Sequence, residues 1–345
     1  MAPRDYALDG LRGLAALAVA GGHSILAFTG MGVWMLTYRQ FADQPFENVM
    51  ARLGYIVAPS DAAVMVFFVL SGHVLWSMFD RRYAGIESLP RCITERLWRL
   101  LPTSIVAGIL FGLATRIGYV APMEPAEVLR TMFILSRDTN GVLWSLQVEI
   151  VASILLFGIW AATGGRSLLA LLLSFPSFLV FRHTGSQYAL FLPAFLLGAA
   201  IANVPGALAR SPLLLLVGVP ILLVSSLFLG HGWEARFLEM AGAVLIVAHV
   251  RASQPRWLLS RPMQFLGLVS YPFYLVHGLG IAFAFRNMPW VPENQTGYRI
   301  VALFVLSTLA ALLLAYVIHR LVERPAMRLP KLIRAPAPVA ERGIA

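Results

Sequence analysis

Apolar stretches of close to 20 residues recur along the whole length of this chain of 345 residues. A helix of that length spans the hydrocarbon core of a bilayer, where backbone polar groups must be satisfied within the protein. Charged residues make up 13% of the chain, against about 25% in soluble domains. The sequence therefore predicts an all-α polytopic membrane protein, a bundle of about ten transmembrane helices.

The predicted spans follow one another without a long polar linker. They lie approximately at residues 11–30, 61–79, 99–118, 142–162, 167–182, 187–203, 212–230, 235–250, 263–285 and 298–320. The fifth and eighth are short, so either could be a re-entrant segment. Because no repeat at a fixed period divides the chain, we expect a single transmembrane domain over residues 1–330 and a short cytoplasmic tail over residues 331–345.

The arginines indicate which ends of the spans face the cytoplasm. With the N-terminus inside, 18 of the 27 basic residues fall in inner segments, and the tail from Arg320 holds six of them. The positive-inside rule then predicts that the N- and C-termini are both cytoplasmic. The segments near 31–60, 119–141 and 286–297 become the longer outer loops.

The net charge of +10 narrows the classes of partner. Its arginines sit between apolar spans rather than on one polar face, so we expect no nucleic acid partner. Membrane lipid headgroups and an anionic co-substrate fit this distribution better. The single cysteine, Cys92, excludes an internal disulfide and a CxxC metal or redox site, and we expect no metal and no permanently bound cofactor.

Two spans place ionisable side chains at depths where a charge is costly. Arg12 lies near the inner end of the first span, and His23 lies about 16 Å farther along that helix. Glu149 lies about 7.5 Å deeper than Trp144, which marks the outer interface. His23 could instead be a packing histidine bonded to a carbonyl, and Glu149 could be a carboxylate paired with an arginine of another helix.

Polar residues on two further spans could face the same interior. Tyr271 and Tyr274 share one helical face, and His277 follows in the outer half of that span. Either a polar lining or ordinary packing would explain them. Ser71 and Gly72 lie near the middle of the second span, where small residues allow helices to approach closely.

Arg96 and Arg99 lie one helical turn apart at the cytoplasmic interface, just before Pro102. Positive-inside anchoring would explain the pair. Arginine forks also bind phosphates with two parallel hydrogen bonds, so a phosphorylated ligand could dock there. On the outer side, Asp61 begins the second span, and we expect it to cap that helix.

Six segments, in this order, resemble motifs of the membrane-bound acyltransferase-3 family. They are YALDGLRGLAALAVAGGH, FFVLSGHVL, RLWRLLP, LWSLQVEI, SYPFYLVH and VERPAMRL. The first includes an arginine followed eleven positions later by a histidine, as the family does. The resemblance covers nearly the whole chain. It departs at His73, where the family usually has Phe.

The resemblance implies about ten core helices and an O-acyltransferase activity. Such enzymes take an acyl group, commonly acetyl, from coenzyme A and transfer it to hydroxyls of sugars, most often on bacterial surface polysaccharides. We therefore expect acyl-CoA as co-substrate, a sugar or polysaccharide as acceptor, and a place in the bacterial cytoplasmic (inner) membrane.

The same resemblance assigns roles to residues of this chain. His23 would be the catalytic histidine, with Arg12 in the same motif and Glu149 as its polar partner in the active site. Arg96 and Arg99 would lie on the donor side. The remaining candidates for contact with the substrates are Ser71, Tyr271, Tyr274 and His277.

His23 could act as general base on the acceptor hydroxyl or carry the acyl group transiently on its imidazole. A proton-coupled transporter is an alternative, since intramembrane His, Glu and Arg also suit transport. A haem-binding redox protein is a third reading, with His23 and His277 as axial ligands.

Overall fold

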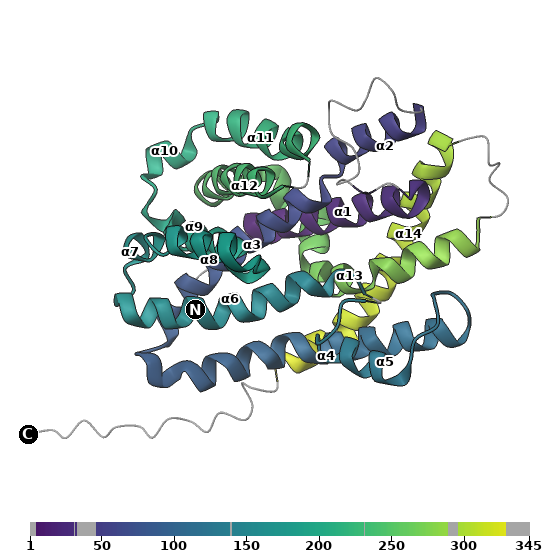
Figure 1. Ribbon diagram of the computed structural model, residues 1–345, viewed down its shortest axis with the longest axis horizontal. Helices are drawn as coiled ribbons and strands as arrows, with labels where there is room; N and C mark the ends of the chain where they lie inside the picture. The colour runs from purple at the N-terminus through teal and green to yellow at the C-terminus, as the bar shows by residue number, and fades with distance from the viewer. Residues whose placement is uncertain are drawn as a thin grey trace, which may run out of the picture.

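The computed structural model describes residues 5–30, 32, 46–138, 140–230, 232–288 and 296–328, and all regular secondary structure in them is helical (Figure 1). The helices are α1 Tyr6–Thr29, α2 Phe46–Val57, α3 Ser60–Arg82, α4 Leu89–Arg116, α5 Pro125–Met132, α6 Leu143–Thr163, α7 Ser167–Leu171, α8 Ser174–Thr184, α9 Gln187–Ala200, α10 Gly206–Arg210, α11 Leu213–Leu229, α12 Trp233–Ser253, α13 Arg261–Arg286, α14 Thr296–Ile318 and α15 Arg324–Ala326. Short 3₁₀ turns lie at Ile86–Ser88, Ile201–Asn203 and Arg256–Leu259, and a π-helical turn lies at His319–Glu323.

Each predicted span coincides with a helix, and the fifth consists of α7 and α8. Seven helical runs of the described chain are long and apolar enough to cross a membrane: Tyr6–Thr29, Val49–Arg82, Ile86–Arg116, Leu143–Thr163, Ser167–Thr184, Arg261–Arg286 and Tyr298–Ala326. The apolar stretches Gln187–Asn203 and Leu213–Ser225 are shorter. The predicted all-α, multi-pass architecture is confirmed.

Helix α12, the eighth predicted span, differs from these runs. It carries Glu234, Arg236 and Glu239 in its first two turns. Arg236 and Glu239 are buried, at 4% and 0% exposure, and Arg236 pairs with Asp61 of α3. Arg236 and Glu239 therefore face the interior of the bundle, as intramembrane charges generally do, whereas Glu234 is exposed.

Two helices occupy segments that we expected to be loops. Helix α2 packs on the end of α1 through Ile25, Ala51 and Tyr55, and α5 packs on α4, with Met132 against Gly108. Both are too short to span a bilayer, so a search for long apolar stretches misses them. Within the predicted outer loops, residues 31, 33–45, 139 and 289–295 lie outside the described residues, as does the predicted tail over 331–345.

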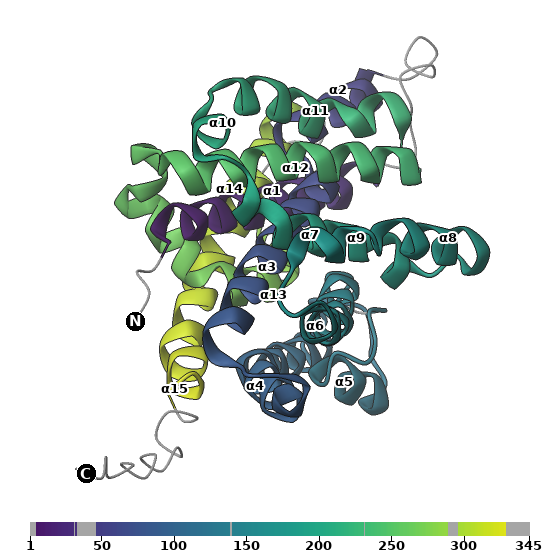
Figure 2. The same cartoon turned by 90° about the vertical axis from the view of Figure 1, so that its left-hand side faces the viewer.

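Helix α3 lies between α11 and α12 on one side and α4 on the other, in both views (Figures 1 and 2). It meets α9 at a very close crossing, where a Cβ on Gly72 would lie 2.1 Å from the carbonyl oxygen of Phe195. A Cβ on Gly198 would lie equally close to the oxygen of Val69. The prediction that the Ser71–Gly72 step allows close helix approach is confirmed.

Two hydrogen bonds gather several helix ends at one end of the bundle. Gln254 Nε2, just after α12, donates to Asp5 Oδ1 at the start of α1 (2.9 Å). Trp98 Nε1 on α4 donates to the carbonyl oxygen of Ala326 (2.8 Å). The described beginning and end of the chain thus lie at the end of the bundle that the arginines predict to be cytoplasmic.

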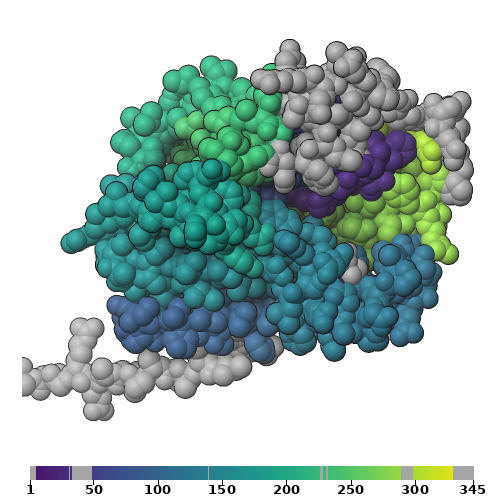
Figure 3. All heavy atoms as spheres, in the orientation of Figure 1, coloured from purple at the N-terminus to yellow at the C-terminus, as the bar shows by residue number. Residues whose placement is uncertain are grey.

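In Figure 3 the side chains of α4 (blue, bottom) and of α6 to α9 (teal, left) form a continuous surface.

Asp61 lies one residue inside α3, which begins at Ser60 with Pro59 as its N-cap and without a capping hydrogen bond from that residue. The Asp61 carboxylate pairs with Arg236, Oδ2 to Nη1, at 3.1 Å. Instead of occupying the cap position, Asp61 joins α3 to α12.

Candidate active site

A cavity of about 1240 Å³ opens among the helix ends predicted to be cytoplasmic. It is bounded by the starts of α1 and α13 and the ends of α3, α12 and α14; we call it the inner vestibule. The arginines that line it are Arg12, Arg81, Arg82, Arg99 and Arg251, and the acids are Asp5, Asp9 and Glu323. Because the arginines outnumber the acids, the vestibule favours an anionic ligand.

A smaller cavity of about 70 Å³ continues from the vestibule into the bundle, and Arg12, Arg99, Ser270 and Tyr271 line both. We call it the chamber, and these four residues its neck. Seven of the nine candidate residues line it: Arg12, Ser71, Arg96, Arg99, Glu149, Tyr271 and Tyr274. Its apolar wall consists of Val64, Phe67, Phe68, Leu100 and Leu146.

Glu149 projects from α6 into the chamber wall and is held by two partners. Arg96 Nη2 forms an ion pair with its Oε1, and Ser71 Oγ donates a hydrogen bond to the same oxygen at 3.0 Å. The structural alternative considered for Glu149, a pair with an arginine of another helix, is thus present.

Arg96 and Arg99 have different surroundings although they share a helical face. The guanidinium of Arg96 is occupied by Glu149, whereas Arg99 lines both the vestibule and the chamber. Arg12 also lines both, and its Nη1 pairs with Asp9 Oδ1 at 3.1 Å. Arg99 and Arg12, rather than the Arg96–Arg99 pair, are therefore placed to meet a ligand entering through the neck.

The two tyrosines contribute polar groups to the chamber. Tyr271 donates from its hydroxyl to the carbonyl oxygen of Leu100 at 2.7 Å. The Tyr274 hydroxyl lies 2.7 Å from Ser145 Oγ, and both side chains line the chamber. The polar-lining reading therefore describes them better than packing alone.

His23 of α1 and His277 of α13 lie in direct contact beyond the chamber, with His23 Nδ1 2.8 Å from His277 Nε2 and the ring centroids 5.0 Å apart. His277 Nδ1 lies 2.8 Å from the carbonyl oxygen of Tyr274, the residue whose side chain lines the chamber. Tyr274 thus links the histidine pair to the chamber.

These contacts determine where the protons lie in the neutral pair. A carbonyl oxygen only accepts, so His277 Nδ1 carries the hydrogen and its Nε2 keeps the lone pair. His23 Nδ1 is then the donor to that nitrogen, which leaves a lone pair on His23 Nε2. This is the form that a general base or a nucleophile requires. The 2.8 Å separation leaves no room for an iron between the two bonded nitrogens, which argues against the haem reading.

The start of α3, which carries Asp61, packs against α1 next to His23. The backbones approach closely here, since a Cβ on Gly22 would lie 2.6 Å from Ser60 Cβ. Asp61 pairs with Arg236, whose Nη1 also lies 2.9 Å from Glu239 Oε2. Sequence reasoning missed this cluster, although two opposite charges inside the predicted span 235–250 were a signal for it.

His73 is buried and lines the vestibule. Its Nδ1 has no hydrogen-bond partner among the described residues.

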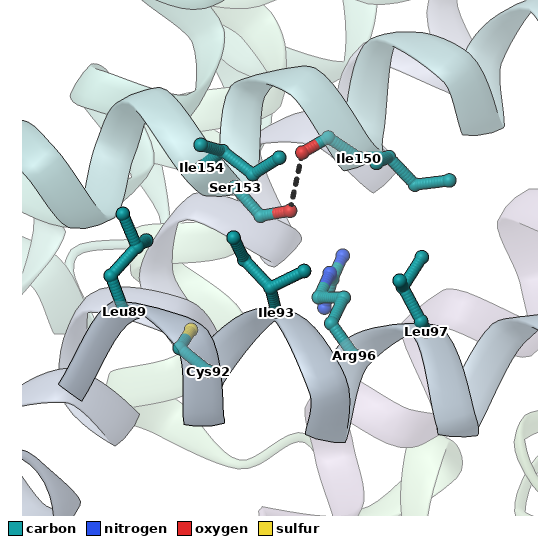
Figure 4. Close-up of a pocket in the computed structure, with 8 residues that line it drawn as sticks. All are labelled: Leu89, Cys92, Ile93, Arg96, Leu97, Ile150, Ser153 and Ile154. Carbon is teal, nitrogen blue, oxygen red and sulfur yellow. Dashed lines mark hydrogen bonds between the residues drawn. The ribbon is translucent and has the colours of Figure 1, made fainter.

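A smaller, apolar side pocket lies between α4 and α6 (Figure 4), lined by Leu89, Cys92, Ile93, Arg96, Leu97, Ile150, Ser153 and Ile154. Arg96 lines both this pocket and the chamber, so its side chain separates the two.

The geometry thus combines an arginine-lined entrance, a small chamber and a basic imidazole. A family model described as an acyltransferase domain, acyltransferase 3, matches residues 5–320. No curated protein and no solved structure matches the chain. The matched region includes all the candidate residues. The chain therefore belongs to the acyltransferase 3 family and is a multi-pass integral membrane O-acyltransferase.

Proposed function

We propose that this enzyme transfers an acetyl group from acetyl-CoA, bound from the cytoplasmic side, to a hydroxyl of a sugar or surface polysaccharide in the bacterial inner membrane. The observation that carries the proposal is the lone pair on His23 Nε2, which follows from the contacts of His23, His277 and Tyr274. An imidazole in this form accepts the proton of a hydroxyl as that oxygen attacks a carbonyl.

The cavities suit an acyl-CoA donor. Its phosphates carry several negative charges that cannot enter hydrocarbon, and the arginines of the inner vestibule supply matching positive charge. Its uncharged arm is long enough to pass the neck and bring the thioester to the chamber. A buried water needs a cavity of roughly 10–15 Å³, so the chamber, at about 70 Å³, has room for only a few groups of that size and favours a short acyl group.

Two routes satisfy this arrangement. In the first, the acceptor oxygen attacks the thioester carbonyl, its proton passes to His23 Nε2, and the carbon–sulfur bond breaks to release the CoA thiolate, which takes that proton from His23. In the second, His23 Nε2 attacks the carbonyl and the carbon–sulfur bond breaks to release the CoA thiolate. The acceptor oxygen then attacks the acyl carbon, the bond from that carbon to Nε2 breaks, and the hydroxyl proton passes to the thiolate. In both, the hydrogen bond from His23 Nδ1 to His277 stabilises positive charge on His23.

The test is transfer of labelled acetyl from acetyl-CoA to cell-surface glycans in isolated membranes. We expect His23→Ala and His23→Gln to abolish transfer, because neither side chain accepts the proton. His183→Ala, which changes an exposed histidine of α8, is the matched control. Full activity of correctly inserted His23→Ala would reject the proposal, as would labelled acetyl-CoA that never yields acetylated glycan with the wild-type enzyme.

A further inference from the structure

Helix α14 ends in one turn of π-helix, His319–Glu323, in which the backbone N–H of Arg324 bonds to the carbonyl of His319. π-Helical turns are rare, and those that occur often lie at functional sites. Here the turn carries two ionisable side chains, with His319 Nδ1 2.6 Å from Glu323 Oε2. Both residues are buried, at 5% and 6% exposure, and both line the inner vestibule.

The contact fixes the chemistry of the imidazole. The Glu323 carboxylate accepts the hydrogen of His319 Nδ1, so in the neutral ring Nε2 carries a lone pair. Carboxylate–histidine pairs of this kind hold an imidazole in one tautomer and one orientation. His319 is therefore a hydrogen-bond acceptor in a cavity whose other charged groups are mostly arginines.

The position of the pair is near the neck rather than at the open end. The π-helical turn packs against α4 and α13, the helices that carry Arg99 and Tyr271, and both of these residues line the vestibule and the chamber. A donor whose phosphates stay with the arginines of the vestibule passes its uncharged arm through this region. That arm bears amide N–H groups and a hydroxyl, which need acceptors and which guanidinium groups cannot satisfy.

We propose that the His319–Glu323 pair is a binding subsite for the pantetheine arm of the acyl donor, with His319 Nε2 accepting a hydrogen bond from an N–H or O–H of that arm. Glu323 is a positioning residue that acts through His319. The inference rests on the proposed function, in that the donor is an acyl-CoA.

The experiment measures kinetics with three acetyl donors of decreasing length: acetyl-CoA, S-acetylpantetheine and S-ethyl thioacetate. The first two contain the arm, and the last has neither its amides nor its hydroxyl. For His319→Ala we expect the donor KM to rise about tenfold with the two longer donors, the equivalent of about 1.4 kcal/mol, with kcat preserved. With S-ethyl thioacetate the variant and the wild type should have the same KM.

Two further variants separate binding from structure. His319→Gln retains a carbonyl acceptor and should recover much of the affinity for the longer donors. His183→Ala changes an exposed histidine of α8 that lines none of the three cavities described above, and it should leave all three KM values unchanged.

The outcomes are distinguishable. A wild-type enzyme that transfers no acetyl from acetyl-CoA rejects the proposed function itself. If the wild type is active, the arm subsite is rejected when His319→Ala raises KM equally for all three donors or lowers kcat alone. If His319→Ala does not fold, His319→Phe, which keeps an aromatic ring and removes the acceptor, takes its place: a rise of KM confined to the two longer donors supports the subsite, and an equal rise for all three donors rejects it.

Discussion

Arg96 on α4 and Ser71 on α3 both contact Oε1 of Glu149, so three helices meet at one carboxylate oxygen in the wall of the chamber. The contact joins α3, which holds the neighbouring apolar wall, to α4 and α6. Removing one member of a buried ion pair leaves the other charge uncompensated, which is costly.

We expect Arg96→Met and Glu149→Leu, made singly, each to lower the free energy of unfolding by about 3 kcal/mol. The double variant should recover most of that loss, because two apolar side chains can replace a buried pair. Thermal unfolding in detergent gives the stabilities, and acetyl transfer is measured on the same samples. A stable double variant with full activity would limit Glu149 to a structural role.

The His23–His277 contact predicts a second effect. Replacing His277 by Phe removes the acceptor of His23 Nδ1–H while keeping an aromatic ring in the buried site. With nothing to hold the hydrogen on Nδ1, either nitrogen of His23 can carry it. By analogy with loss of the orienting group in a catalytic triad, kcat should fall by about 10² to 10⁴, with the donor KM little changed.

The kinetics of His277→Phe are compared with those of Phe273→Leu, which alters the neighbouring ring on the same helix without touching the hydrogen bond. We expect a small loss in Phe273→Leu. Equal losses in the two variants would mean that His277 serves packing alone.

The close crossing of α3 and α9 gives a stability prediction. Gly72→Ala would place a methyl group 2.1 Å from a backbone oxygen of α9, so the helices must separate, at a cost of about 3 kcal/mol. Gly158→Ala is the matched control, since nothing lies within 4 Å of a Cβ built at Gly158. The yield of folded protein after detergent extraction should fall for the first variant and remain at the wild-type level for the second.

The buried cluster behind His23 predicts an asymmetry. Arg236→Met leaves the carboxylates of Asp61 and Glu239 without the guanidinium that both contact, and we expect a loss of about 3 to 5 kcal/mol. Arg210→Met, at the exposed end of α10, should change stability little. Comparable melting temperatures for the two variants would show that the cluster contributes nothing to stability.

The positions of the spans could be predicted because the bilayer imposes length and hydropathy on each helix separately. The chamber residues could also be predicted from the sequence, because Glu149, Arg12 and the tyrosines are polar groups at depths where lipid would exclude them. Which of these groups pair could not be predicted. His23 and His277 are 254 positions apart, and their contact depends on how α1 and α13 cross. For the same reason, an arginine of another helix could be foreseen as a partner of Glu149, but not that this arginine is Arg96.

The arginines of the inner vestibule predict how donor affinity depends on the nucleotide. Arg81 and Arg82 are exposed at the end of α3 and line the vestibule, so we expect them to attract the phosphates without taking part in chemistry. In Arg81→Gln/Arg82→Gln the KM for acetyl-CoA should rise about tenfold at low salt, with kcat unchanged. The difference from wild type should shrink as salt is added, because screening weakens exposed charges. The KM for S-acetylpantetheine, which has no phosphate, should stay the same, and Arg210→Gln should behave as wild type with both donors. An equal rise for both donors would mean that the two arginines maintain the shape of the vestibule instead of binding phosphate.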